Sequence, residues 1–161
     1  VGIAYNGEIL HRWQARLCDT FSPFGSLGLA PDGASDVAVA SGKPGVDIVV
    51  GEASGVYRKY WRPSTGWSGW DVHGAPAGAR TYSAAASWNK AGTSFDLIAL
   101  AGTKIYRKTW AGSSFSSWCS LGAGYDTFNP DALTAAWRTT GQLDVFAVNY
   151  HDGSIGWKYL G

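Results

Sequence analysis

The chain has 161 residues, enough for one domain with a sizeable hydrophobic core. Only 16% of these residues are charged, the formal net charge is +1, and arginine and lysine are scattered, so binding of nucleic acid is not expected. No apolar run approaches the roughly 20 residues that a membrane-spanning helix needs, so no membrane span is expected either.

Short segments rich in β-branched and aromatic residues follow one another along the chain, separated by glycine-containing turns. The chain holds 22 glycines and 9 tryptophans, which suits many short strands joined by tight turns. Asn6-Gly7 and Asp152-Gly153 each separate two such segments, and they favour hairpins because a type I′ turn needs positive φ at both central residues. No helix-length segment shows a 3.6-residue periodicity, so we predict an all-β fold.

Four types of predicted strand recur in a constant order. The first type covers residues 1–5, 46–50, 95–99 and 143–147. The second covers residues 9–13, 56–61, 105–110 and 155–159. The third covers residues 24–28, 70–74 and 118–122, and the fourth, which is rich in alanine, covers residues 36–40, 83–88 and 133–137. The repeat is about 48 residues long, since 49 residues separate Tyr57 from Tyr106 and 49 separate Trp88 from Trp137.

This repeat predicts a β-propeller of four-stranded antiparallel blades, because self-similarity at such a period is typical of stacked supersecondary units. The alanine-rich strand fits the innermost position, where the blades crowd around the axis. The whole chain, 1–161, is then a single propeller segment. It comprises a partial blade (1–28), two blades (36–74 and 83–122) and a second partial blade (132–161).

The predicted blades make up about half of a seven-bladed ring. An isolated part of a propeller leaves faces and strand edges uncovered, which favours association. We therefore expect a second chain or missing sequence to complete the propeller. The sequence holds no methionine and so lacks an initiator, which indicates a processed chain or part of a longer one and favours a secreted or extracellular protein.

Several segments resemble the repeats of bacterial and fungal propeller lectins. They are Gly66-Trp67-Ser68-Gly69-Trp70, Pro76-Ala77, Ala86-Ser87-Trp88, Leu143-Asp144-Val145-Phe146-Ala147 and Asp152-Gly153. The resemblance covers nearly the whole chain and is strongest to the seven-bladed type from insect-pathogenic bacteria, which binds fucose and O-methylated sugars; a six-bladed fungal type of fucose lectin is less similar. It implies a multivalent carbohydrate-binding protein with no catalytic activity and no cofactor, whose partners are glycans.

The first and last repeats depart from the family pattern. The first has Phe24 where a later repeat has Trp70, and Ser41-Gly42 near the position of Trp88. The last repeat has Gly156-Trp157 where two others have a Tyr-Arg pair. If sugar sites follow the repeats, these departures predict that not all of the sites are functional.

Sugar sites place an aromatic ring against the C–H face of the sugar and polar groups against its hydroxyls. Arginine suits the second task because its guanidinium offers several donors in a fixed geometry. The repeats supply both residue types at equivalent positions, and the predicted sugar-binding residues are Tyr57, Arg58, Trp61, Trp88, Tyr106, Arg107, Trp110 and Trp137. The alternative is a packing role between blades, with the arginine stems lying along aromatic surface.

Asp47, Asp96 and Asp144 occupy one position in three successive repeats. This repetition argues for a structural role, such as a hydrogen bond at a turn or strand end, rather than for catalysis. No catalytic set and no metal-binding cluster is recognisable in the sequence, so we expect neither catalytic residues nor a metal. Cys18 and Cys119 fall in blades that lie far apart, and we expect both to be unpaired within the chain.

Two other functions stay open on the sequence. A non-catalytic protein-interaction propeller would bury its aromatic residues and bind no sugar, whereas an accessory or catalytic propeller of a glycan-processing enzyme would gather unmatched polar residues at one end of its axis. A lectin repeats its polar residues from blade to blade, as this chain does. The sequence therefore favours a lectin for fucose-like or O-methylated sugars, in which several weak sites give avidity.

Overall fold

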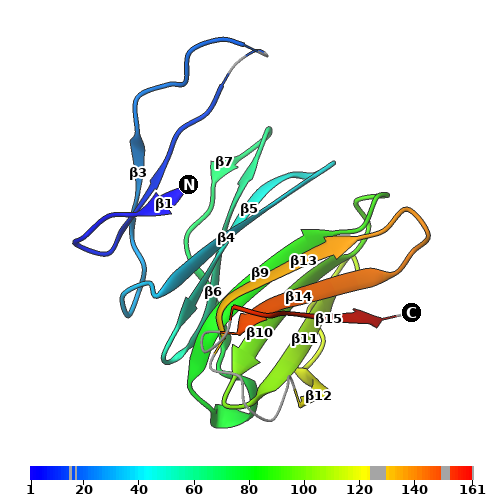
Figure 1. Ribbon diagram of the computed structural model, residues 1–161. Helices are drawn as coiled ribbons and strands as arrows, with labels where there is room; N and C mark the ends of the chain where they lie inside the picture. The colour runs from blue at the N-terminus through cyan, green and yellow to red at the C-terminus, as the bar shows by residue number, and fades with distance from the viewer. Residues whose placement is uncertain (15, 17, 124–129, 150–152, 161) are drawn as a thin grey trace.

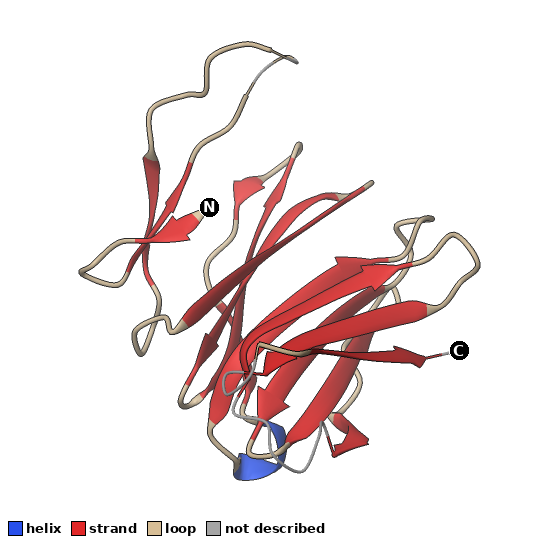
Figure 2. Cartoon of the chain, viewed as in Figure 1, coloured by secondary structure: helices blue, strands red, loops and turns tan. Residues whose placement is uncertain are grey.

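The computed structural model describes residues 1–14, 16, 18–123, 130–149 and 153–160. Within this part most of the residues lie in antiparallel strands, and the helical content is the short 3₁₀ turn η1 (Pro76–Gly78) (Figure 2). The predicted all-β class is confirmed. Asp152, expected in the last hairpin turn, lies outside the described residues. No helix in the described ranges is long and apolar enough to cross a membrane.

The described strands form four sheets. Sheet 1 consists of β1 (Gly2–Ile3), β2 (Glu8–His11) and β3 (Gly25–Leu29). Sheet 2 consists of β4 (Asp36–Gly42), β5 (Gly45–Glu52), β6 (Gly55–Arg62), β7 (Gly66–Trp67) and β8 (Asp71–Gly74). Sheet 3 consists of β9 (Thr81–Trp88), β10 (Phe95–Ala101), β11 (Lys104–Trp110) and β12 (Cys119–Ala123). Sheet 4 consists of β13 (Pro130–Trp137), β14 (Leu143–Asn149) and β15 (Ile155–Leu160).

Except for β8, which pairs with β6, neighbouring strands in each sheet are also neighbours in the chain, and the alanine-rich strands β4, β9 and β13 each form one edge of their sheets. The short strand β7 was not predicted: Trp67 pairs with Trp61 near the end of β6, and β8 pairs with the beginning of β6. Gly55 opens β6 with φ of 148°, and a Cβ there would lie 2.4 Å from the carbonyl carbon of Gly74. Only glycine therefore allows β6 and β8 to approach so closely at this point.

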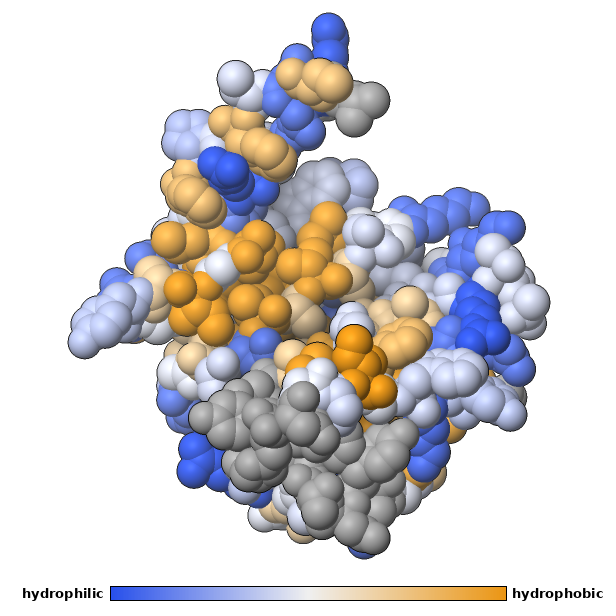
Figure 3. All heavy atoms as spheres, viewed as in Figure 1, coloured by the Kyte–Doolittle hydropathy of each residue, from blue (hydrophilic) through white to orange (hydrophobic). Residues whose placement is uncertain are grey.

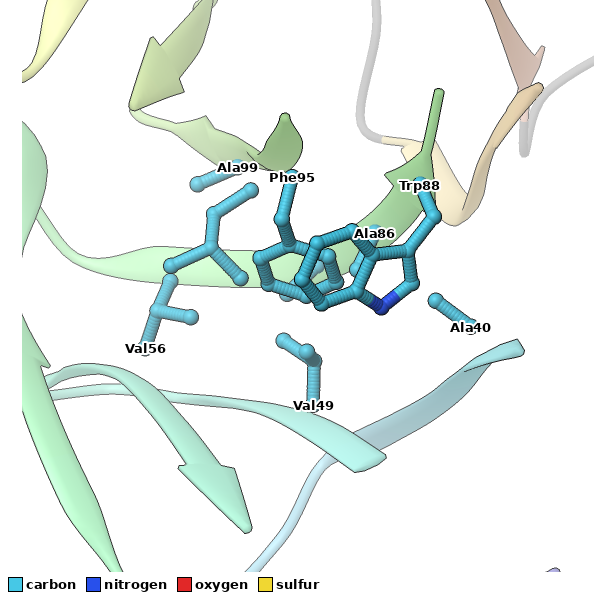
Figure 4. Close-up of a cluster of buried hydrophobic side chains, with 9 residues drawn as sticks. Ala40, Val49, Val56, Ala86, Trp88, Phe95 and Ala99 are labelled. Atoms are coloured by element: carbon cyan, nitrogen blue, oxygen red, sulfur yellow. The ribbon is translucent and has the colours of Figure 1, made fainter. Parts of the chain in front are cut away.

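Buried side chains gather in three clusters, each between two consecutive sheets. The sheets thus pack in chain order, with β1–β3 at one end and β13–β15 at the other (Figure 1). We call the face that a sheet turns toward the next sheet its front, and the opposite face its back. Val49 and Val56 lie on the front of sheet 2 and face Phe95 and Trp88 of sheet 3, whose rings lie side by side (Figure 4).

His73, on β8, is packed against sheet 3. Its ring meets the Phe115 ring edge-on, with 4.4 Å between centroids. Its carbonyl oxygen accepts hydrogen bonds from the Trp118 indole at 3.0 Å and from Lys108 at 3.2 Å. Burial, together with the positive charges of Lys108 and Arg58, lowers the pKa of His73 from 6.5 to about 4, so the imidazole is neutral at physiological pH.

We expect this histidine to make the protein less stable as the pH falls from 6.5 to about 4. In that range the unfolded chain binds a proton that the folded chain does not, so the stability present above the unfolded pKa is lost toward the folded pKa. The loss should be roughly 1–2 kcal/mol, because solvent screening of a partly exposed ring reduces the limit of about 3 kcal/mol set by the shift. Urea unfolding of the wild type and of His73→Gln at several pH values measures it. Identical pH dependence in the two proteins would contradict the assignment.

Candidate functional site

Asp47 joins the front of sheet 2 to sheet 3. Its carboxylate is fully buried and accepts two hydrogen bonds from Arg58 on β6, from Nε at 2.8 Å and from Nη2 at 2.6 Å. Arg62 donates to the same carboxylate from Nη2 at 3.0 Å. The indole nitrogen of Trp88, on β9 of sheet 3, donates to Oδ2 at 2.7 Å. The buried charge is therefore both paired and hydrogen-bonded, as a stable buried carboxylate must be.

The same link recurs between sheets 3 and 4. Asp96 is fully buried and accepts from Nε of Arg107 at 2.8 Å, from the Thr109 hydroxyl at 2.6 Å and from the indole nitrogen of Trp137 at 2.8 Å. In both links the indole belongs to the alanine-rich strand of the following sheet, 41 residues after the aspartate. The aspartates thus have the structural role that their repetition predicted, but their hydrogen bonds join neighbouring sheets rather than a turn.

Asp144 repeats the aspartate on sheet 4 with different partners. Arg138, just after β13, donates to it from Nε at 2.5 Å, and this hydrogen bond lowers the pKa of the Asp144 carboxyl below its usual value. An indole nitrogen also donates at 2.9 Å, but it belongs to Trp157 on β15 of the same sheet. The strand pairing shows that Trp157 in sheet 4 has the position of Arg58 in sheet 2 and of Arg107 in sheet 3.

The structure places four of the predicted sugar-binding residues inside these links. Arg58 is 8% exposed and Trp88 is 7% exposed, and both point into the junction between sheets 2 and 3. Arg107 and Trp137 repeat this arrangement one sheet later, with the guanidinium of Arg107 5.8 Å from the centre of the Trp137 ring.

The two tyrosines and Trp110 are also packed against protein. Tyr57 is 7% exposed, and its hydroxyl donates to Oδ2 of Asp32 at 3.0 Å. Tyr106, at the equivalent position of sheet 3, is 9% exposed. Trp110 meets the Trp88 ring edge-on, with 5.7 Å between centroids. The last predicted residue, Trp61, has a different environment.

Trp61 lines a cavity of about 530 Å³ between sheets 1 and 2. Its lining residues are Val1, His11, Arg12, Trp13, Val39, Val46, Ile48, Trp61 and Trp67. His11 belongs to sheet 1, Val1 precedes β1, and Arg12 and Trp13 follow β2, whereas sheet 2 contributes the others. On the face shown in Figure 3, hydrophobic residues gather over β1 and β4, the strands nearest to Val1 and Val39.

The strand ladders explain why this junction is open. Phe95 pairs with Trp88 and with Trp110, and Val46 pairs in the same way with Ser41 and with Trp61. Ser41 therefore occupies the position of Trp88, and Val46 occupies that of Phe95. Because this junction lacks one indole and one phenyl ring, space remains beside the ring of Trp61. In the next junction, the indole of Trp88 fills the equivalent space beside Trp110.

The walls of the cavity are aromatic and carry few polar groups. The ring of His11 stacks on Trp13 with centroids 5.3 Å apart and meets Trp67 edge-on at 5.2 Å. Nδ1 of His11 lies 3.0 Å from the carbonyl oxygen of Gly25, which only accepts, so Nδ1 donates and Nε2 of the neutral ring is the acceptor. Arg12 also lines the cavity, but its guanidinium lies over the rings of Phe21 and Phe24, 4.5 Å and 5.1 Å from their centres.

Sequence reasoning missed His11, Arg12 and Trp13 because they lie in the repeat that departs most from the others. The available signal was the serine at position 41, in a place where two other repeats have tryptophan. Cys18 and Cys119 are free, as predicted, and both are exposed. Among the described residues, no group of three or more His, Cys, Asp or Glu side chains is arranged to hold a metal ion.

Comparison with known proteins adds no assignment. No protein-family model matches the chain. No curated protein matches it either.

Proposed function

We propose that the chain is a carbohydrate-binding lectin, that its sheets are blades of a β-propeller, and that a sugar binds in the cavity between sheets 1 and 2. The observation that carries the proposal is the aromatic cavity of about 530 Å³, at a junction where serine replaces the tryptophan that closes the other two. Its volume lies within the range of about 300–1,000 Å³ that is typical of small-molecule sites.

The lining residues suit the chemistry of a monosaccharide. Trp61 is 36% exposed and Trp13 is 57% exposed, so each presents part of its ring to a ligand. Such rings pack against the apolar C–H face of a sugar, and the methyl group of a fucose-like or O-methylated sugar adds to the apolar contact. Nε2 of His11 accepts a hydrogen bond from one sugar hydroxyl.

On this proposal the repeated arginines and tryptophans divide into two groups. Arg58, Arg107, Trp88 and Trp137 hold neighbouring blades together through the aspartates, and Trp61 contacts the sugar. The partners are glycans, and a secreted or extracellular location would bring the protein to them.

We expect Trp61→Ala to weaken sugar binding about tenfold, because an aromatic contact contributes roughly 1 kcal/mol beyond its buried area. A glycan array of fucosylated and O-methylated sugars identifies the ligand, and titration calorimetry measures the affinity of each variant. The control is Tyr82→Ala, which removes a ring that is 38% exposed, against 36% for Trp61, and that is not part of the cavity lining. No binding to any glycan by the folded protein would overturn the lectin proposal and favour the protein-interaction propeller.

A further inference from the structure

The front of sheet 4 carries large apolar side chains that no described element covers. On β15, Ile155 is 70% exposed, Trp157 is 47% exposed and Tyr159 is 58% exposed. The strand ladders align Ile155 with Ile105 of sheet 3 and with Val56 of sheet 2. Those two residues are 6% and 0% exposed, because the next sheet packs on them.

The back of sheet 1 is also uncovered, and it carries an exposed aromatic residue. Phe24 is 59% exposed and lies one residue before Gly25, the partner of His11. Trp70 and Trp118 have the same place relative to Arg58 and Arg107. A cation covers the ring in all three sheets, since Arg12 lies 5.1 Å from Phe24, Lys59 lies 5.4 Å from Trp70 and Lys108 lies 5.5 Å from Trp118.

Trp118 shows what this aromatic position does inside the chain. Its indole nitrogen donates to the carbonyl oxygen of His73 on sheet 2, so the residue joins the back of its own sheet to the front of the preceding one. Trp70 likewise packs against the cluster between sheets 1 and 2. Phe24 has the same orientation, but in the described part of the chain it has no preceding sheet to contact.

We propose that the front of sheet 4 binds the back of sheet 1 of a second copy of this chain. Inside the chain, the front of each sheet packs on the back of the following sheet. Among the described residues, one front, that of sheet 4, and one back, that of sheet 1, are uncovered. Because the two faces differ, the contact is head-to-tail and heterologous. The proposal depends on how the sheets pack and not on sugar binding.

The partners of Asp144 fit this choice of neighbour. In the two junctions inside the chain, the following sheet supplies the indole from its alanine-rich strand. Sheet 1 shows no such strand within the described residues, because β1 is its edge. Sheet 4 needs none from its neighbour, since Trp157 of the same sheet already donates to Asp144. The Asp144 carboxylate therefore has its indole donor without an alanine-rich strand from a neighbouring sheet, and this is the strand that sheet 1 lacks.

Sedimentation equilibrium of the 161-residue chain over a range of concentrations tests the association. The wild type should self-associate, and Ile155→Glu should weaken self-association at least tenfold by placing a charge in the contact. Val72→Glu is the matched control, because Val72 is 69% exposed on β8 and lies outside both faces. Near-UV circular dichroism confirms that each variant is folded. A wild type that stays monomeric, or association that Ile155→Glu leaves unchanged, would overturn the proposal.

A mixing experiment tests the head-to-tail geometry. Ile155→Glu disables the front of sheet 4, and Phe24→Glu disables the back of sheet 1, so each variant alone should be monomeric. Mixed together they should form a 1:1 dimer, because one variant keeps an intact front and the other keeps an intact back. Failure of the mixture to associate, with both variants folded, would refute head-to-tail pairing.

Discussion

Replacing Asp47 with alanine should lower the free energy of unfolding by about 3–5 kcal/mol, the usual result of removing one partner from a buried ion pair. The carboxylate is fully buried and accepts hydrogen bonds from Arg58, Arg62 and Trp88. Without it, the charge of Arg58 stays in a largely buried site with no carboxylate at 2.6 Å. Equilibrium unfolding in urea, with unchanged slope, measures the loss.

Asp71→Ala is the matched control for this prediction. The Asp71 carboxylate also faces Arg58, at 3.6 Å, but its side chain is 45% exposed. An exposed pair contributes only about 0–1 kcal/mol, so this variant should be nearly as stable as the wild type. Losses of similar size in the two variants would mean that the link between sheets 2 and 3 does not depend on burial of Asp47.

Replacing Ser41 with tryptophan should abolish sugar binding without unfolding the protein. The new indole would occupy the position that Trp88 and Trp137 have in the next two sheets. It would fill the space beside the ring of Trp61. Because the added ring and a sugar would compete for the same volume, we expect a loss of affinity of at least tenfold. Titration calorimetry with the sugar found on the glycan array measures it, and thermal unfolding reports the stability.

Ser113→Trp is the corresponding control. Ser113 is an exposed residue between β11 and β12 and is not part of the cavity lining, so a tryptophan there should leave sugar affinity unchanged. Unchanged affinity in Ser41→Trp, with the indole in place, would show that sugar binds elsewhere.

The all-β fold could be predicted from the sequence because its signals are local. Asn6-Gly7 does join β1 to β2, and Gly7 has φ of 81°, but the φ of Asn6 is not positive, so the turn is not of the type I′ that the sequence favoured. The repeat of about 48 residues then assigned each strand to a type, and the described sheets contain these strands in the expected order. The short strand β7 escaped prediction because two paired residues leave no recognisable pattern.

The roles of individual residues were harder to predict, because a repeat shows which positions are equivalent but not which side chains meet. Arg58 and Trp88 were both recognised as repeated residues, yet only the packing of sheet 2 on sheet 3 brings them to Asp47. The cavity arises because position 41 carries a serine in place of a tryptophan. Its volume depends on sheet 1, whose sequence diverges from the repeat.

The link between each aspartate and a tryptophan 41 residues later gives assembly a direction. During synthesis, sheet 2 emerges from the ribosome before Trp88 does, so we expect Asp47 and Arg58 to be exposed to water at first. The front of sheet 2 is covered when sheet 3 packs on it. Sheet 3 then exposes Asp96, which still lacks the indole donor from sheet 4. Such long-range pairing is slow compared with forming a hairpin. We therefore expect the sheets to become ordered from the N-terminus toward the C-terminus, since each buried aspartate needs an indole from the sheet that follows it.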